Sequence, residues 1–189
     1  MTLLSLLIPT LSSRTEQCLS LVDSLLDQVE KGNYVGLVEI VTLYDGGEKS
    51  IGRKRNELIQ MAKGKYVCFI DDDDSVATNY IELLMDGIAH DVDCCSLRGV
   101  ITWNGENAEL FEHSIKYGAY TTTSNAIRYE RYPNHLNCIK KEICNQFQYP
   151  EINHGEDTDW ATQVFKSGLI KTEHYIDAVL YHYKFITNK

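Results

Sequence analysis

Four consecutive aspartates, at positions 71 to 74, are the side chains of this sequence best suited to chemistry. Adjacent carboxylates repel one another and are expensive to hold together without a cation. Hard divalent ions such as Mg2+ and Mn2+ prefer oxygen ligands, usually one or two carboxylates completed by oxygens of a substrate phosphate. The run therefore indicates a metal site that presents a phosphorylated substrate, with a solvated acidic turn as the simpler alternative.

The segment before the aspartates places them at the end of a buried strand. Residues 65–70 are Lys-Tyr-Val-Cys-Phe-Ile, an apolar run rich in β-branched and aromatic residues, which suits a strand covered on both faces. Open α/β sheets bind ligands at the carboxyl ends of their strands. Polar residues fall at the ends of other expected elements too, namely Asp45, His154, Glu156, Asp157 and His182.

The first half of the chain has the pattern of a doubly wound α/β sheet. A helix is expected to begin at the capping box that Ser13 opens and to stop at Gly32, and a second is expected at residues 51–62. These helices alternate with strands that we expect at residues 3–8, 37–43 and 65–70. Such a β-α-β-α-β order predicts a mostly parallel sheet.

The second half is expected to add a small antiparallel extension. The Asn104-Gly105 pair between two apolar stretches is a hairpin signal. Residues 121–132 are polar and fit no element clearly. The remaining expected elements are helices at residues 79–88 and 157–166 and strands at 92–97, 100–103, 108–111 and 175–183. With no linker, repeat or low-complexity stretch, residues 1–189 are predicted to form a single domain.

Composition excludes several classes of protein. The 189 residues suit one globular domain, with 43% apolar and 24% charged residues. A net charge of −9 without a basic tail argues against a nucleic-acid-binding protein, which needs a Lys/Arg face. The six cysteines form no C-x-x-C pair, which favours a reduced, cytoplasmic setting without structural zinc. No signal peptide and no membrane span are predicted.

Taken in order, the motifs resemble those of the family 2 glycosyltransferases of the GT-A fold, over nearly the whole chain. A D-x-D motif alone is weak evidence, but here it stands between an upstream R-N and a downstream G-E-D. The resemblance implies a nucleotide-sugar-binding half at residues 1–97 and an acceptor and catalytic-base half at 98–189. The motifs are Leu6-Leu-Ile-Pro9, Tyr44-Asp45-Gly46, Gly52-Arg-Lys-Arg-Asn56, Asp71-Asp-Asp-Asp74, His135-Leu-Asn137 and Gly155-Glu-Asp157.

The resemblance also implies roles on the donor side. Asp45 would accept a hydrogen bond from the nucleotide base, although it also suits an Asx turn. Asp73 would bind Mn2+ or Mg2+ directly, and His182 is a candidate further ligand, unless it is simply a structural or exposed histidine. The role of Asp74 is left open, because a D-x-D shifted by one residue would include it and because it could equally cap the next turn. The implied nucleotide-sugar-binding residues are Pro9, Asp45, Arg55, Asn56, Asp71 and Asp72.

On the acceptor side, Asp157 matches the general base of the family, with Glu156 as its rival. Two acidic residues at a helix N-terminus are also favourable without any catalytic role. His135 and His154 are candidate acceptor-site residues, each with a structural role as the plainer alternative.

The activity that the resemblance implies is inverting transfer of one sugar, from a nucleotide sugar, expected to be a UDP-sugar, to a saccharide or other hydroxyl acceptor. Processive members carry Q-x-x-R-W and membrane helices, whereas this chain has Gln163-Val-Phe-Lys166. Two alternatives stay open: a nucleotidyltransferase-like enzyme on a similar sheet, and a non-catalytic module that binds a sugar nucleotide. The oligomeric state is left open.

Overall fold

Parallel strands from the first half of the chain form one side of a six-stranded sheet. The computed structural model describes residues 1–186. Strand β1 (Leu4–Leu11) pairs in parallel with β2 (Val38–Asp45) on one side and with β3 (Tyr66–Phe69) on the other. The sheet has the order β11-β5-β10-β3-β1-β2, so β2 is one edge. The other side consists of three short strands, β10 (Ile139–Lys140), β5 (Cys94–Cys95) and, at the edge, β11 (Glu173–His174).

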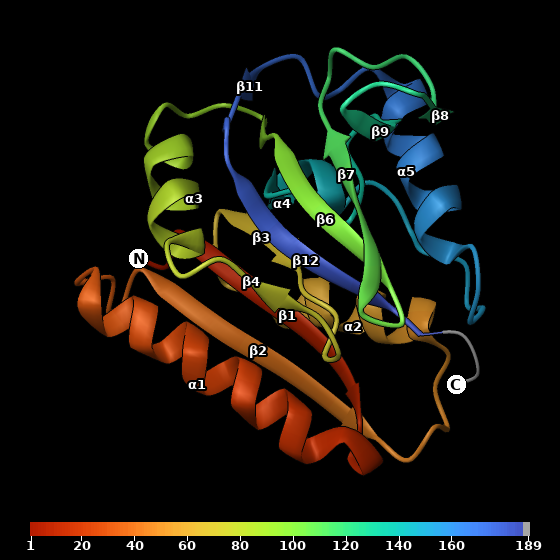
Figure 1. Ribbon diagram of the computed structural model, residues 1–189. Helices are drawn as coiled ribbons and strands as arrows, with labels where there is room; N and C mark the ends of the chain where they lie inside the picture. The colour runs from red at the N-terminus through yellow and green to blue at the C-terminus, as the bar shows by residue number, and fades with distance from the viewer. Residues whose placement is uncertain (187–189) are drawn as a thin grey trace.

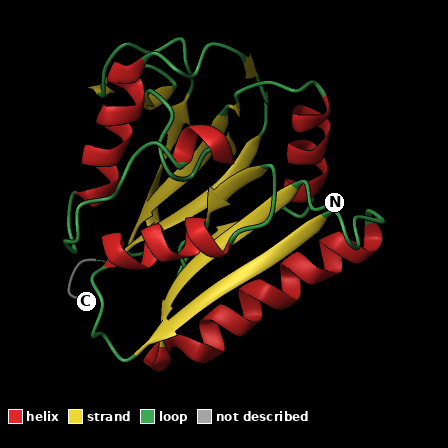
Figure 2. Cartoon of the chain, turned by 180° about the vertical axis from the view of Figure 1, so that it is seen from behind, coloured by secondary structure: helices red, strands yellow, loops and turns green. Residues whose placement is uncertain are grey.

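Helices cover both faces of this sheet (Figure 1, Figure 2). Side chains of β1 alternate between the faces, so Leu6 and Ile8 belong to one apolar core and Leu7 to another. The first core includes residues of α1 (Thr15–Lys31) and α3 (Tyr80–Ala89), and the second includes residues of α2 (Ile51–Met61), α4 (Lys141–Cys144) and α5 (Glu156–Ser167). The predicted doubly wound α/β arrangement is confirmed, and this double burial explains why β1 is apolar along its length.

The extension is a second six-stranded sheet in which parallel and antiparallel pairs alternate. Its order is β4-β12-β6-β7-β9-β8, and β12 pairs in parallel with β6, as the blue and green strands of Figure 1 show. The hairpin is confirmed, because Asn104 and Gly105 join β6 to β7 with positive φ angles of 54° and 85°. The strands are β4 (Ser75–Val76), β6 (Leu97–Trp103), β7 (Glu106–His113), β8 (Thr121–Thr122), β9 (Ile127–Arg131) and β12 (Val179–Phe185).

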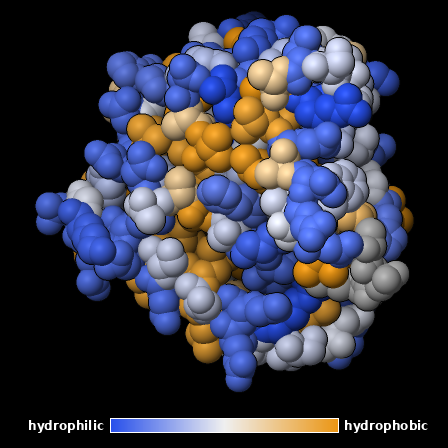
Figure 3. Space-filling view, viewed as in Figure 1, coloured by the Kyte–Doolittle hydropathy of each residue, from blue (hydrophilic) through white to orange (hydrophobic). Residues whose placement is uncertain are grey.

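Apolar side chains reach the surface in the central part of the face seen in Figure 1, and hydrophilic residues surround them (Figure 3). All six cysteines are buried and unpaired, as expected for thiols that pack as small apolar groups. No helix within residues 1–186 has both the length and the apolar character of a membrane span.

The start of α2 approaches residues 150–152 very closely, and Gly52 makes this approach possible. The Gly52 N–H donates to the carbonyl oxygen of Ile152 at 3.2 Å. A Cβ atom at position 52 would lie 1.9 Å from the carbonyl oxygen of Pro150. The contact joins α2 to the loop that leads into α5, and both helices supply residues to the site described below.

Gly52→Ala is expected to destabilise the protein by about 1–3 kcal/mol, because backbone must move to relieve the overlap and this outweighs the better helix propensity of alanine. Urea denaturation measures the change. Gly118→Ala is the matched control, since a Cβ there meets nothing within 4 Å. Equal stability of the two variants would contradict the close approach.

Candidate active site

The acidic turn lies at the carboxyl end of β3, where β1 and β2 also end. It is a true turn, since the Asp74 N–H donates to the carbonyl oxygen of Asp71 at 3.1 Å. A cleft of about 490 Å3 lies beside it. The structure brings most of the predicted donor-side residues together there, because the lining includes Pro9, Thr10, Arg14, Lys49, Lys54, Arg55, Asp71, Asp72, Asp73, His154 and Glu156.

Arg55 is a buried cation that joins two carboxylates of the cleft. Its Nη2 donates to Asp71 Oδ1 at 3.0 Å and its Nε to Glu156 Oε1 at 3.3 Å, and its guanidinium lies 5.0 Å from the centre of the Phe69 ring. Burial opposes ionisation of Asp71, but Arg55 and His135 outweigh it and hold the pKa of Asp71 well below its usual range. Arg55 is therefore a link between strand β3 and helix α5, a role the sequence did not predict.

Asp72 and Asp73 differ in exposure although they are neighbours. Asp72 is 4% exposed, and its two oxygens accept hydrogen bonds from Thr10 Oγ1 at 2.5 Å and Arg14 Nη1 at 2.8 Å. The side chain of Asp73 is 22% exposed, with Arg14 Nη1 at 3.3 Å from its Oδ2. Sequence reasoning missed Arg14, which forms part of the short 3-10 helix at Ser12–Arg14 and belongs to no motif.

The side chain of the fourth aspartate, Asp74, is hydrogen-bonded to the second sheet and does not line the cleft. Asp74 is 5% exposed and accepts hydrogen bonds from the Tyr181 hydroxyl and the Lys184 N–H, both at 2.8 Å. Tyr181 also accepts the Asp71 N–H at 3.1 Å. Burial, together with the nearby Asp71, raises the pKa of Asp74 to about 7. Through these hydrogen bonds, Asp74 connects the acidic turn to strand β12.

Asp45 stands at the end of β2 with both carboxylate oxygens occupied. Oδ1 accepts from Lys54 Nζ and Oδ2 from the Lys49 N–H, each at 2.8 Å. Burial opposes ionisation, but these hydrogen bonds lower the pKa of Asp45. Lys54 is 4% exposed and also donates to the carbonyl oxygen of Thr10 at 2.9 Å. The role of Asp45 toward a nucleotide base stays a prediction.

Asp45 is not part of the cleft lining, and two further predicted site residues lie outside it. Asn56 does not line the cleft, because its side-chain amide exchanges two hydrogen bonds of 2.9 Å with the backbone of Tyr149. His182 is exposed and lies in β12 between Tyr181 and Tyr183. Since strand side chains alternate, His182 faces away from Tyr183, which lines the pocket described next. His182 lines neither hollow of the site, contrary to its predicted place at the metal.

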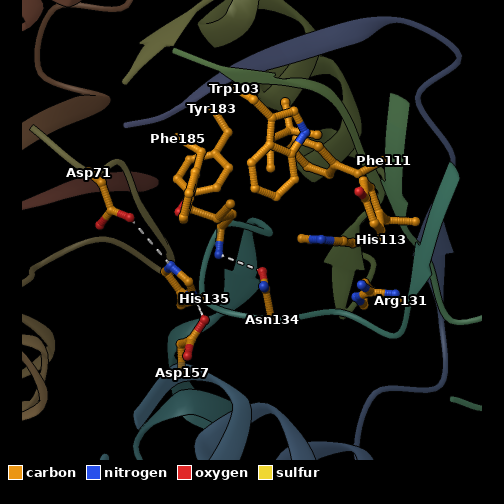
Figure 4. Close-up of a pocket in the computed structure, with 13 residues that line it drawn as sticks. Asp71, Trp103, Phe111, His113, Arg131, Asn134, His135, Asp157, Tyr183 and Phe185 are labelled. Atoms are coloured by element: carbon orange, nitrogen blue, oxygen red, sulfur yellow. Dashed lines mark hydrogen bonds and ion pairs between the residues drawn. The ribbon is translucent and has the colours of Figure 1, made fainter. Parts of the chain in front are cut away.

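A second hollow of about 380 Å3 adjoins the cleft, and Asp71 lines both. Figure 4 shows His135 between Asp71 and Asp157. The Nε2 atom of His135 lies 3.9 Å from Asp71 Oδ2, and its Nδ1 lies 3.8 Å from Asp157 Oδ2. His135 is 6% exposed, and neither of its ring nitrogens has a hydrogen-bond partner. It thus occupies the predicted acceptor side, whereas His154 lines the cleft.

Glu156 and Asp157 begin α5, and their side chains enter different hollows. Gly155 precedes them with a φ of 83°, a left-handed conformation that favours glycine and starts the helix sharply. Glu156 is 5% exposed, faces the cleft and pairs with Arg55. Asp157 faces the second pocket with its side chain 34% exposed. Consecutive carboxylates therefore have distinct surroundings.

The cleft has the oxygen donors that a hard divalent ion requires. Of the two neighbours Asp72 and Asp73, Asp73 fits a metal ligand better, because its side chain is 22% exposed and lines the cleft whereas Asp72 is 4% exposed. Within residues 1–186, three potential ligand atoms lie within 4.8 Å of one another in a single group, formed by Asp86, His90 and His174. That group lies near the opposite edge of the sheet, since Asp86 shares a hollow with Leu3 and Lys65, which precede β1 and β3.

Comparison with known proteins adds a family and a fold. Residues 23–147 match the family model described as Glycosyl transferase family 2. No curated protein matches the sequence. The crystal structure of S. aureus TarS 1–349 in complex with UDP-GlcNAc has a TM-score of 0.66 at 15% identity, covering 100% of this chain and 60% of that chain. The corresponding complex with UDP has a TM-score of 0.62 at 16% identity, covering 97% and 60%. This chain thus spans about three-fifths of those chains.

Replacing Arg55 by glutamine is expected to destabilise the protein by about 3–5 kcal/mol at neutral pH, because the buried Glu156 and the partly buried Asp71 lose their cation. Arg55 lowers the folded-state pKa of Asp71, so its contribution is present above the unfolded pKa and is lost as the pH falls through the folded one. The difference between wild type and Arg55→Gln should therefore shrink at about pH 4 and below.

Urea denaturation of both proteins at neutral pH and at about pH 4 and below measures this effect. Arg53→Gln is the control on the same helix, because Arg53 forms an exposed pair with Glu57 and its loss should change stability by only about 0.5 kcal/mol. A difference for Arg55→Gln that does not depend on pH would argue against the charge network.

Proposed function

Because the chain belongs to glycosyl transferase family 2, we propose that it transfers one sugar from a nucleotide-sugar donor to a hydroxyl group of an acceptor. The observation that carries this proposal is the division of the carboxylates between two adjoining hollows. Asp71, Asp72, Asp73 and Glu156 line the cleft, and Asp157 lines the pocket. A donor in the cleft and an acceptor in the pocket would meet beside Asp71, which lines both.

We propose a UDP-sugar as the donor, with its diphosphate beside the acidic turn. The complexes of TarS with UDP-GlcNAc and with UDP support this choice, because those chains share the fold. The acidic turn alone would repel a diphosphate, but Arg14 and Lys49 also line the cleft and supply positive charge. Pro9 lies at the same strand end and would border the nucleotide.

A divalent cation, Mn2+ or Mg2+, is proposed at Asp73. Carboxylate and phosphate oxygens are the donors that both ions prefer. When bound, such an ion stabilises the negative charge that develops on the departing nucleoside diphosphate. The partly buried salt bridge between Arg55 and Asp71 holds the turn in place from the other side.

Asp157 is proposed as the general base. It would take the proton from the acceptor hydroxyl while that oxygen forms a bond to the anomeric carbon and the bond to the nucleoside diphosphate breaks. Attack from the side opposite to the leaving group inverts the anomeric configuration. Glu156 is the poorer candidate because it is nearly buried and paired with Arg55. His135, 3.8 Å from Asp157, would keep the carboxylate directed into the pocket.

Product analysis tests the proposed reaction. Incubation with a panel of nucleotide sugars, Mn2+ and mixed acceptors should release a nucleoside diphosphate and a glycoside of inverted configuration. Release of pyrophosphate would instead support a nucleotidyltransferase on this fold, and binding of nucleotide sugars without any turnover would support a non-catalytic module.

Asp157→Asn should lower kcat by about 10²–10⁴, because the amide keeps the size of the side chain but cannot accept the proton. Donor affinity, measured by calorimetry with UDP, should stay near wild type. Glu156→Gln is the comparison, and it should affect kcat less. The assignment of the base would move to Glu156 if the two variants behaved in the reverse way.

Asp73→Asn should weaken UDP binding in the presence of Mn2+ and nearly abolish turnover, because a neutral amide offers less charge to the ion. Calorimetric titration of UDP with and without Mn2+ measures the first effect. His182→Ala is the control, since His182 lies outside the cleft, and its Mn2+ titration should match that of wild type. Full activity of the wild type in excess EDTA would refute the metal site.

A further inference from the structure

The second pocket has opposite charges at its two ends. Asp71 and Asp157 lie at one end, and Arg131 lies at the other, beside His113 (Figure 4). Between them the walls are largely apolar and aromatic, including Trp103, Phe111, Tyr129, Tyr183 and Phe185. A molecule that fills the pocket would therefore meet carboxylates at one end and a cation at the other.

Arg131 differs from every other arginine of the chain. Arg14, Arg53, Arg55, Arg98 and Arg128 each have a carboxylate oxygen within 4.0 Å. Arg131 has none among the described residues, and its side chain donates hydrogen bonds from Nη1 to the carbonyl oxygens of Thr121 at 2.7 Å and Glu130 at 3.0 Å. Its guanidinium lies over the rings of Tyr120 and Tyr129, at 4.8 and 5.4 Å from their centres.

The surroundings of Arg131 make the positive charge of its guanidinium energetically unfavourable. The side chain is half-buried, and burial lowers the pKa of Arg131. A charge held away from water without a counter-ion is unfavourable, and a ligand that brings an anion removes that cost. A guanidinium is well suited to this role, since its planar donors match the oxygens of a phosphate or a carboxylate.

His113 adds a ring nitrogen without a hydrogen-bond partner at the same end. It is 5% exposed, and its Nδ1 has no hydrogen-bond partner. Burial lowers the pKa of His113 to about 3, so the ring is neutral at physiological pH and offers hydrogen bonding without charge. Strands β7 and β9 place it beside Arg131, because His113 and Arg131 are register partners.

We propose that this pocket binds an acceptor that carries an anionic group, a phosphate or a carboxylate, with the anion at Arg131 and the reacting hydroxyl toward Asp157. The inference rests on the proposed function in naming the ligand an acceptor. The aromatic walls suit the apolar face of a sugar ring or the carbon chain of a polyol. A volume of about 380 Å3 admits a ligand of that size.

A binding experiment tests the inference without donor or turnover. Trp103 lines the pocket, and the other tryptophan, Trp160, is 1% exposed in a separate core, so quenching of Trp103 fluorescence reports occupancy. Glucose 6-phosphate, glucuronate and glucose are the probes, and Trp103→Phe gives the blank. We expect at least one anionic probe to bind the wild type about tenfold or more tightly than glucose. The two anions distinguish a phosphate from a carboxylate as the recognised group.

Arg131→Gln should remove this preference for the anion and leave glucose binding unchanged. Arg128→Gln is the matched control on the same strand, because Arg128 already pairs with Glu109, and it should keep the preference. Arg131→Lys keeps the charge but not the planar donors, so it should retain a reduced preference and covers the case in which Arg131→Gln fails to fold.

Several results would overturn the inference. These are equal binding of glucose and both anions by the wild type, failure of both anions to bind, equal weakening of all three probes in Arg131→Gln, or loss of the preference in Arg131→Lys. The last two would make Arg131 a structural support for Tyr120 and Tyr129. Because the probes do not require a donor, a preference for anions with no release of nucleoside diphosphate would refute the proposed function and not the anion site.

Discussion

The site depends on one buried cation, Arg55. Its guanidinium is 3% exposed and lies between Asp71, at the end of a central strand, and Glu156, at the start of α5. Without it, two acidic segments that are far apart in sequence would repel each other in a poorly solvated place. With it, the edge of the sheet and the N-terminus of the helix are held together, and the cleft and the pocket meet along this junction.

The second sheet supplies the other half of the support. Tyr181 and Lys184 of strand β12 donate hydrogen bonds to Asp74. The acidic turn is therefore fixed on one side by Arg55 and on the other by the second sheet. Four adjacent carboxylates are thereby separated in function by their surroundings. Asp71 is paired with Arg55, Asp72 accepts one hydrogen bond at each oxygen, Asp73 lines the cleft, and the buried Asp74 is hydrogen-bonded to β12. The same separation distinguishes Glu156 from Asp157.

The sequence was sufficient to predict the features that have a local pattern. The β-α-β-α-β order, the hairpin at Asn104-Gly105 and the position of the acidic turn follow from apolar spacing and turn residues. Arg14 and Arg131 were not predicted, because neither belongs to a motif and their importance lies in partners distant in sequence. Asn56 and His182 do not line the cleft, since a motif gives a position along the chain but not the direction of a side chain. Strand β12 begins at Val179, later than expected, and alternation along it directs His182 away from the pocket.

We propose that one reaction spans the two hollows that meet beside Asp71. A crystal structure with Mn2+ and a non-hydrolysable UDP-sugar analogue tests it most directly. We expect the diphosphate to lie in the cleft beside Asp73 and the anomeric carbon to face the pocket, with Asp157 on the side opposite to the diphosphate. A nucleotide bound outside the cleft, or a sugar directed away from Asp157, would contradict it.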